Sequence, residues 1–115
     1  MRATILSAAL AICPTVGLAE DWWVVVGYFD HPPLEWDDGI LKQGQDLEAD
    51  LSGCNMRVFW DFAGKFEGFN TDSRGTVFVV DTPKALTELE AEELAEAAAL
   101  CVPDAYSKTA RYFGE

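Results

Sequence analysis

The hydrophobic pattern along the chain switches between a period of two, typical of strands, and steps of three and four, typical of helices. Residues 23–29, WVVVGYF, are β-branched and aromatic and predict a first strand, which must end at the two prolines that follow His31. From 34 to 51 the apolar residues fall at helical steps, and Gly44 lies within their stripe. A glycine there costs about 1 kcal/mol of helix propensity, which a close approach to a sheet can offset.

The second half of the chain shows the same alternation of periods. Residues 55–62 alternate cleanly and predict a second strand, and the turn-rich segment 63–75 connects it to a third strand at 76–80. A second helix is predicted at 87–101, because it opens with the capping box TELE and ends just before a proline. Residues 105–112 alternate again and predict a fourth strand.

The predicted order is therefore β-α-β-β-α-β in a single domain. The economical arrangement is a ferredoxin-like α+β fold, with a four-stranded antiparallel sheet and two helices on one face. The opposite face of the sheet is then expected to be open to solvent.

The first 19 residues have the pattern of a secretory signal. Arg2 is followed by an apolar run too short to span a bilayer, and Gly17-Leu18-Ala19 offers a peptidase small residues at both positions that it reads. We expect cleavage after Ala19, a mature domain at 20–115 without a membrane anchor, and a soluble periplasmic or secreted protein. A lipid anchor on Cys13 is the alternative, although Ile12 precedes it where a small residue is expected.

Export also changes how the cysteines are interpreted. Cleavage removes Cys13 and leaves Cys54 and Cys101, and an even pair in an exported chain predicts a disulfide. An ideal ferredoxin-like fold argues against this bridge, because its antiparallel helices would end at opposite edges of the sheet. A disulfide requires its Cα atoms to lie within about 4.4–6.8 Å of each other. The pairing is therefore a hypothesis in conflict with the predicted topology.

The sequence offers little support for catalysis. His31 is the only histidine, lies beside two prolines and has no cysteine or serine partner in sight, so we expect a solvated loop histidine. The acidic pairs Asp37-Asp38 and Glu92-Glu93 fit wet helix faces better than a dry catalytic cleft. No spacing typical of zinc or calcium ligands occurs. We expect a protein that is not an enzyme and needs neither cofactor nor metal.

Several segments together resemble SPOR-like domains, which are small βαββαβ modules of the bacterial envelope. The resemblance rests on WWVVVGYF (22–29), KFEGF (65–69), GTVFVV (75–80) and CVPDAYSK (101–108). It implies binding of peptidoglycan, especially glycan strands without stem peptides. The chain departs from the family at 81–83, where Asp-Thr-Pro replaces the usual Gly-Pro-aromatic. The alternative is a domain that keeps this fold but has lost glycan binding.

The open face of the predicted sheet is the candidate binding surface. Aromatic rings can stack on sugar rings, and exposed apolar patches often mark binding sites. By strand parity, the candidate ligand-binding residues are Tyr28, Arg57, Phe59, Phe78, Tyr106, Lys108 and Tyr112. The alternative is that this face packs against a second copy or a neighbouring loop.

Charge separates two classes of partner. The chain carries a net charge of −12, which becomes −13 when Arg2 is removed, and this disfavours nucleic acid. Many of the acidic residues lie on the two predicted helices, whereas most bases lie on the second and fourth strands or on 63–75. The sheet side therefore suits an acidic glycan. The helical side suits a basic envelope protein, for example a wall-cleaving enzyme that this chain would inhibit.

Overall fold

The computed structural model describes residues 21–114, so the predicted signal sequence lies outside the described residues. Along the chain the elements are β1 (Asp21–Phe29), α1 (Asp38–Ser52), β2 (Val58–Phe62), the 3-10 helix η2 (Ala63–Lys65), β3 (Phe66–Glu67), β4 (Thr76–Val80), α2 (Glu88–Ala98) and β5 (Tyr106–Tyr112). The predicted capping box is present, with Thr87 and Glu90 each accepting the other's backbone N–H. Helix α1 begins later than expected, at the N-cap Asp37.

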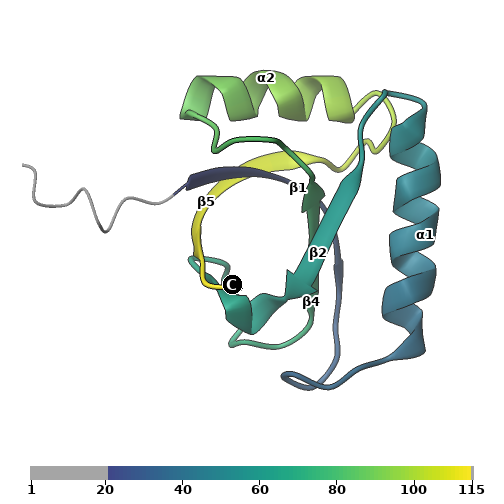
Figure 1. The fold of residues 1–115 in the computed structure, drawn as a ribbon, viewed down its shortest axis with the longest axis vertical. Coiled ribbons are helices and arrows are strands. Elements are labelled where there is room, and N and C mark those ends of the chain that lie inside the picture. Colours follow the sequence, from purple (N-terminus) through teal and green to yellow (C-terminus); the bar gives the residue numbers. More distant parts are fainter. Residues whose placement is uncertain (1–20, 115) are drawn as a thin grey trace, which may run out of the picture.

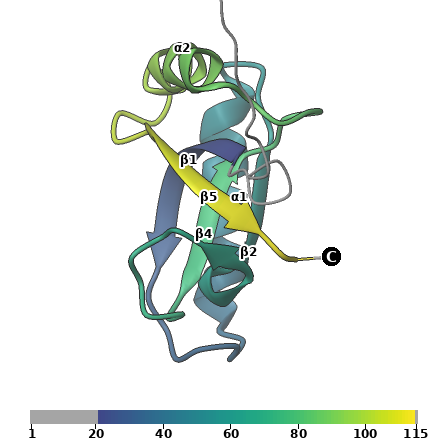
Figure 2. The same cartoon turned by 90° about the vertical axis from the view of Figure 1, so that its left-hand side faces the viewer.

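The strands form one antiparallel sheet in the order β2-β4-β1-β5-β3. The predicted mixed α+β class is confirmed. The four-stranded ferredoxin-like sheet is not confirmed, because β3 forms a fifth strand within the predicted connection and the sheet curls strongly (Figure 1). Figure 2 shows β5 crossing diagonally in front of β1 and β4.

Both helices pack on the outer face of the curled sheet, where the larger core lies (Figure 1). Phe78 is completely buried there and its ring lies 5.6 Å from that of Trp60. Gly44 explains how α1 can come so close, because a Cβ atom on it would lie 2.7 Å from the Trp60 ring. The cost of a glycine in the helix is thus offset by close packing against β2.

The inner face of the sheet forms a second core, so the expectation of an open face is wrong for most of it. The fully buried members of this inner core are Val25, Ala63, Phe66, Val77, Val79 and Ala110, and Trp23, Phe59, Phe69 and Tyr112 pack against them. The segment 63–75, expected to be a simple connection, contributes three of these side chains. Alternation along the sequence predicts the strands themselves. It could not show that both faces of the sheet are buried in apolar cores.

Local irregularities allow the sheet to close on itself. The register between β1 and β4 shifts between Val25 and Gly27, a bulge that increases local twist. Gly68 has a φ of 127° and lies against the backbone of Ala110, so only glycine fits there without strain. At the far end of the curl, the Tyr112 hydroxyl donates to the carboxylate of Asp61 at the end of β2.

His31 differs from the expectation of a solvated loop residue, because only 3% of it is exposed. Its Nδ1 lies 2.8 Å from the carbonyl oxygen of Pro32, and its Nε2 lies 2.7 Å from the Thr76 hydroxyl. The ring also packs between Phe29 and Phe62. Both nitrogens are therefore used within the fold, and His31 anchors the turn after β1.

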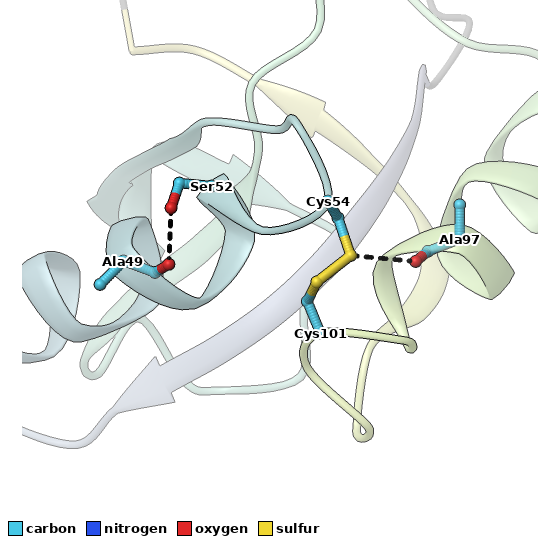
Figure 3. Close-up of a disulfide and its surroundings, with 5 residues drawn as sticks. All are labelled: Ala49, Ser52, Cys54, Ala97 and Cys101. Carbon is cyan, nitrogen blue, oxygen red and sulfur yellow. Dashed lines mark hydrogen bonds between the residues drawn. A yellow bond between two sulfur atoms is a disulfide. The ribbon is translucent and has the colours of Figure 1, made fainter.

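The disulfide between Cys54 and Cys101 is present, with a Cα–Cα distance of 6.2 Å. The predicted conflict disappears because the helices do not run antiparallel on the sheet. They lie along two different sides of it and their C-terminal ends meet at one corner (Figure 1). Figure 3 shows the bridge at this corner, next to the carbonyl of Ala97. Among the described residues, no helix is long and apolar enough to cross a membrane.

We predict that replacing both Cys54 and Cys101 by serine lowers the free energy of unfolding by about 2–4 kcal/mol, because the bridge closes a long loop in the unfolded chain. Urea denaturation with and without a reductant measures the effect. The reductant should lower the urea midpoint of the wild type and leave the midpoint of the double variant unchanged. Equal midpoints for all samples would contradict the prediction.

Candidate functional site

A groove of about 580 Å³ opens between the loop that follows β3 and the inner face of β1, β4 and β5. It is the part of the inner face that the segment 63–75 leaves uncovered. Its lining residues are Val25, Tyr28, Asp30, Phe69, Asn70, Thr71, Asp72, Arg74, Val77, Tyr106 and Lys108. Val25, Val77 and Phe69 also belong to the inner core or pack against it, so the groove has an apolar floor. Charged and aromatic side chains form its rim.

The β1 side of the groove is built around Tyr28. The ring lies against Gly75, which has a φ of 84° and where a Cβ atom would clash with the Tyr28 hydroxyl oxygen. The hydroxyl lies 2.9 Å from the carbonyl oxygen of Arg74 and 3.3 Å from a carboxylate oxygen of Asp30. Partial burial and, after it, the charge of Asp30 raise the pKa of Tyr28 above 10.0. At neutral pH the hydroxyl therefore stays protonated and donates.

Arg74 and Asp30 form an ion pair across the end of the groove. Nε of Arg74 donates to one carboxylate oxygen at 3.0 Å, and Nη2 donates to the other at 3.4 Å. This hydrogen bonding is the largest cause that lowers the pKa of Asp30 below its usual 3.8. Both side chains remain substantially exposed, so the pair positions the loop but is screened by water. The guanidinium keeps further N–H donors for a ligand.

The opposite wall comes from β5, where Tyr106 and Lys108 point to the same face. Tyr106 pairs with Val25 of β1 in the register and Lys108 pairs with Trp23, which places both on the inner side of the sheet. Tyr106 is 52% exposed, a large fraction for an aromatic residue in a strand. Lys108 makes no ion pair with any residue in 21–114. The wall therefore presents one ring face and one unneutralised ammonium group.

The loop wall contains a polar atom without a partner. The hydroxyl oxygen of Thr71 is buried, and in the described part of the chain it has no hydrogen-bond partner. Buried hydroxyl groups are normally satisfied, so this one is unusual. Asp72 and Ser73 follow with φ values of 54° and 64°, a left-handed conformation that residues other than glycine adopt at a cost. The loop thus has unusual backbone geometry where it faces the groove.

The structure brings together three of the seven predicted binding residues, Tyr28, Tyr106 and Lys108. Phe59 and Tyr112 also lie on the inner face but line a second cavity at the other end of the inner core. Arg57 lines neither cavity and lies next to α1, where it pairs with Glu48. The placement of Phe78 on the binding face is wrong, because β4 turns Val77 and Val79 inward and Phe78 toward α1.

Sequence reasoning missed the loop residues of the groove. Arg74 and Thr71 lie in the turn-rich segment 63–75, which has no period from which a facing direction could be derived. The KFEGF stretch was the one available signal, because its Phe66 and Phe69 hold the loop against the inner core.

The arrangement is suited to binding. An exposed ring, the ammonium group of Lys108 and a guanidinium paired with Asp30 surround an apolar floor, and Asp72 adds a carboxylate to the lining. The ring and the ammonium group fit a ligand that has a flat apolar face and a negative charge. The described residues contain no cluster of three His, Cys, Asp or Glu side chains that could hold a metal ion.

We predict that Arg74→Ala raises the pKa of Asp30 toward 3.8, because it removes the hydrogen bonds that favour the carboxylate. The wild-type pair stabilises the fold at neutral pH, and this contribution is lost as the pH falls through the lowered pKa of folded Asp30. NMR titration of the side-chain carboxyl carbon measures the shift. Lys42→Ala, which removes a distant base, is the control and should leave Asp30 unchanged. An unchanged pKa in Arg74→Ala would contradict the assignment.

Comparison with known proteins returns no match to any family model, curated protein or solved structure. The resemblance to SPOR-like domains therefore rests only on the sequence segments that suggested it. The function of the chain has to be argued from the groove itself.

Proposed function

We propose that this chain is an exported, non-enzymatic module that binds peptidoglycan glycan strands through the groove. The observation that carries the proposal is the convergence of Tyr28, Tyr106 and Lys108 on one groove beside Arg74. The strand and helix order also supports a ferredoxin-like core, if β3 is taken as an addition to a βαββαβ chain. We further propose that the protein works in the periplasm after removal of residues 1–19.

The chemistry of the groove matches an acidic sugar polymer. The exposed face of Tyr106 offers an apolar platform for a sugar ring, and the neighbouring valine floor adds apolar contact. Lys108 and the remaining donors of Arg74 can pair with sugar carboxylates. The groove lies on the inner face of the sheet, whereas both acidic helices pack on the outer face, which reduces repulsion of an anionic ligand.

We predict that the purified protein co-sediments with peptidoglycan sacculi, and that amidase-stripped sacculi retain more of it than intact sacculi do. Tyr106→Ala should lower retention roughly two- to tenfold, because a lost stacking contact is worth about 0.5–1.5 kcal/mol. Lys108→Ala should weaken retention mainly at low salt, since its contribution is electrostatic. Sedimentation followed by densitometry measures both effects.

Matched variants make this result specific. Trp36→Ala removes an aromatic side chain that is 57% exposed and lies outside the groove, so it should bind as the wild type does. Lys42→Ala is the corresponding control for Lys108→Ala, because Lys42 lies on the exposed face of α1. If no salt concentration gives retention, or if Trp36→Ala loses as much as Tyr106→Ala, the glycan proposal is wrong.

A second candidate function is docking of a basic envelope protein on the outer face of α2. Leu89, in the first turn of α2, and Leu100, two residues beyond its end, are 64% and 85% exposed, and Glu92, Glu93 and Glu96 lie exposed between them. Apolar side chains at both ends of an acidic stretch complement a basic surface with apolar neighbours, and the carboxylates would steer its approach.

We predict that a variant carrying Glu88→Lys, Glu92→Lys and Glu96→Lys loses any binding to lysozyme, used as a basic wall-cleaving probe. Isothermal calorimetry at low and moderate salt measures the loss. A second variant with Glu35, Asp50 and Asp104 changed to lysine has the same net charge and should retain the binding. Equal loss in both variants would show a nonspecific charge effect and rule out α2 as the docking face.

A further inference from the structure

A second cavity, of about 260 Å³, lies at the other end of the inner core. It lies where the start of β1 meets the ends of β4 and β5 and the segment that leads to α2. Its lining residues are Asp21, Trp22, Trp23, Phe59, Val80, Asp81, Thr82, Lys84, Ala85 and Tyr112. Neither the groove nor the acidic face of α2 accounts for it.

Aromatic rings from three separate strands form its inner wall. The ring of Tyr112 lies edge-on to Trp23 at 5.8 Å and to Phe59 at 5.6 Å. The indole N–H of Trp23 is already used, because it donates to the carbonyl of Ala110 at 2.9 Å. These interactions hold the rings in place, so the cavity is lined by preorganised ring surfaces and not by mobile side chains.

The charges at its rim are negative. Asp21 and Asp81 are exposed, and neither carboxylate makes a hydrogen bond or an ion pair with another residue in 21–114. Lys84 also lines the cavity, but its ammonium group lies 3.2 Å from a carboxylate oxygen of Glu90 and is neutralised there. The rim therefore keeps two uncompensated negative charges next to the ring surfaces.

We propose that this cavity binds an alkylammonium group, either a primary ammonium such as a lysine side chain or a quaternary one such as choline. Aromatic faces attract cations through their quadrupoles, most strongly for Trp and then Tyr and Phe. Asp21 and Asp81 add direct Coulomb attraction at the entrance. The ammonium group lies against the ring surfaces, where the carboxylates at the rim also attract it.

The two cavities therefore differ in their charges. In the groove Arg74 pairs with Asp30, and Lys108 and Asp72 make no ion pair within 21–114, whereas in this cavity Lys84 pairs with Glu90 and two carboxylates, those of Asp21 and Asp81, remain. The inference does not depend on glycan binding, because it uses different residues at the opposite end of the inner core. Loss of either activity by mutation can leave the other intact.

The test compares cations with neutral compounds of the same shape. Choline is titrated against 3,3-dimethyl-1-butanol, and butylammonium against butanol, at constant ionic strength. The indole N–H signals of Trp22 and Trp23 in two-dimensional NMR report occupancy. We expect at least one cation to shift these signals saturably, with a dissociation constant in the millimolar range. Its neutral partner should bind at least about fivefold more weakly. The stronger of the two cations identifies the primary or the quaternary class.

Paired variants assign the charge. A variant with Asp21→Asn and Asp81→Asn should bind the preferred cation about fivefold or more weakly, while Asp50→Asn with Asp104→Asn, the same charge change elsewhere, should bind as the wild type does. Equal shifts with cation and neutral alcohol would overturn the proposal. So would the absence of shifts with both cations, or an equal loss in the two double variants.

Discussion

The contact between Tyr112 and the end of β2 is the interaction on which the rest of the structure depends. Tyr112 is the last residue of β5, and its hydroxyl reaches Asp61 while its ring packs edge-on against Phe59. β2 and β5 are separated in the sheet by β4 and β1, so this contact exists only because the sheet curls. It converts one face of the sheet from a surface into a second core. The binding sites are what remains uncovered at the two ends of that core.

This geometry gives a small chain two cavities of different character. The segment 63–75 covers the middle of the inner face with Phe66 and Phe69, and it leaves a groove with cationic side chains on one side and an aromatic cavity with carboxylates on the other. The outer core and the disulfide fix the helices separately, at the other face and at one corner. Substitutions on the rims of the cavities therefore need not disturb the packing that holds the fold together.

The hydrophobic pattern of the sequence predicts most of the strands and helices, but it predicts fewer of the residues that line the groove. The third strand at 76–80 and the capping box at Thr87 follow from patterns that the structure confirms. The fifth strand could not be predicted, because two residues within a turn-rich segment carry no period. Phe78 was assigned to the wrong face because every residue of β4 is buried, so its alternation contains no polar side to orient it. Arg74 and Thr71 reach the groove only through the curl.

The most direct test of this account is the NMR observation of through-space contacts between ring protons of Tyr112 and those of Phe59 in the purified protein. A closed inner core predicts cross-peaks between these rings, and between Tyr112 and Phe66, whose ring centroids lie 4.8 Å apart. If the ring protons of Tyr112 show no cross-peaks to either phenylalanine, the account is wrong. The inner face would then be an open sheet, and neither cavity would exist as described.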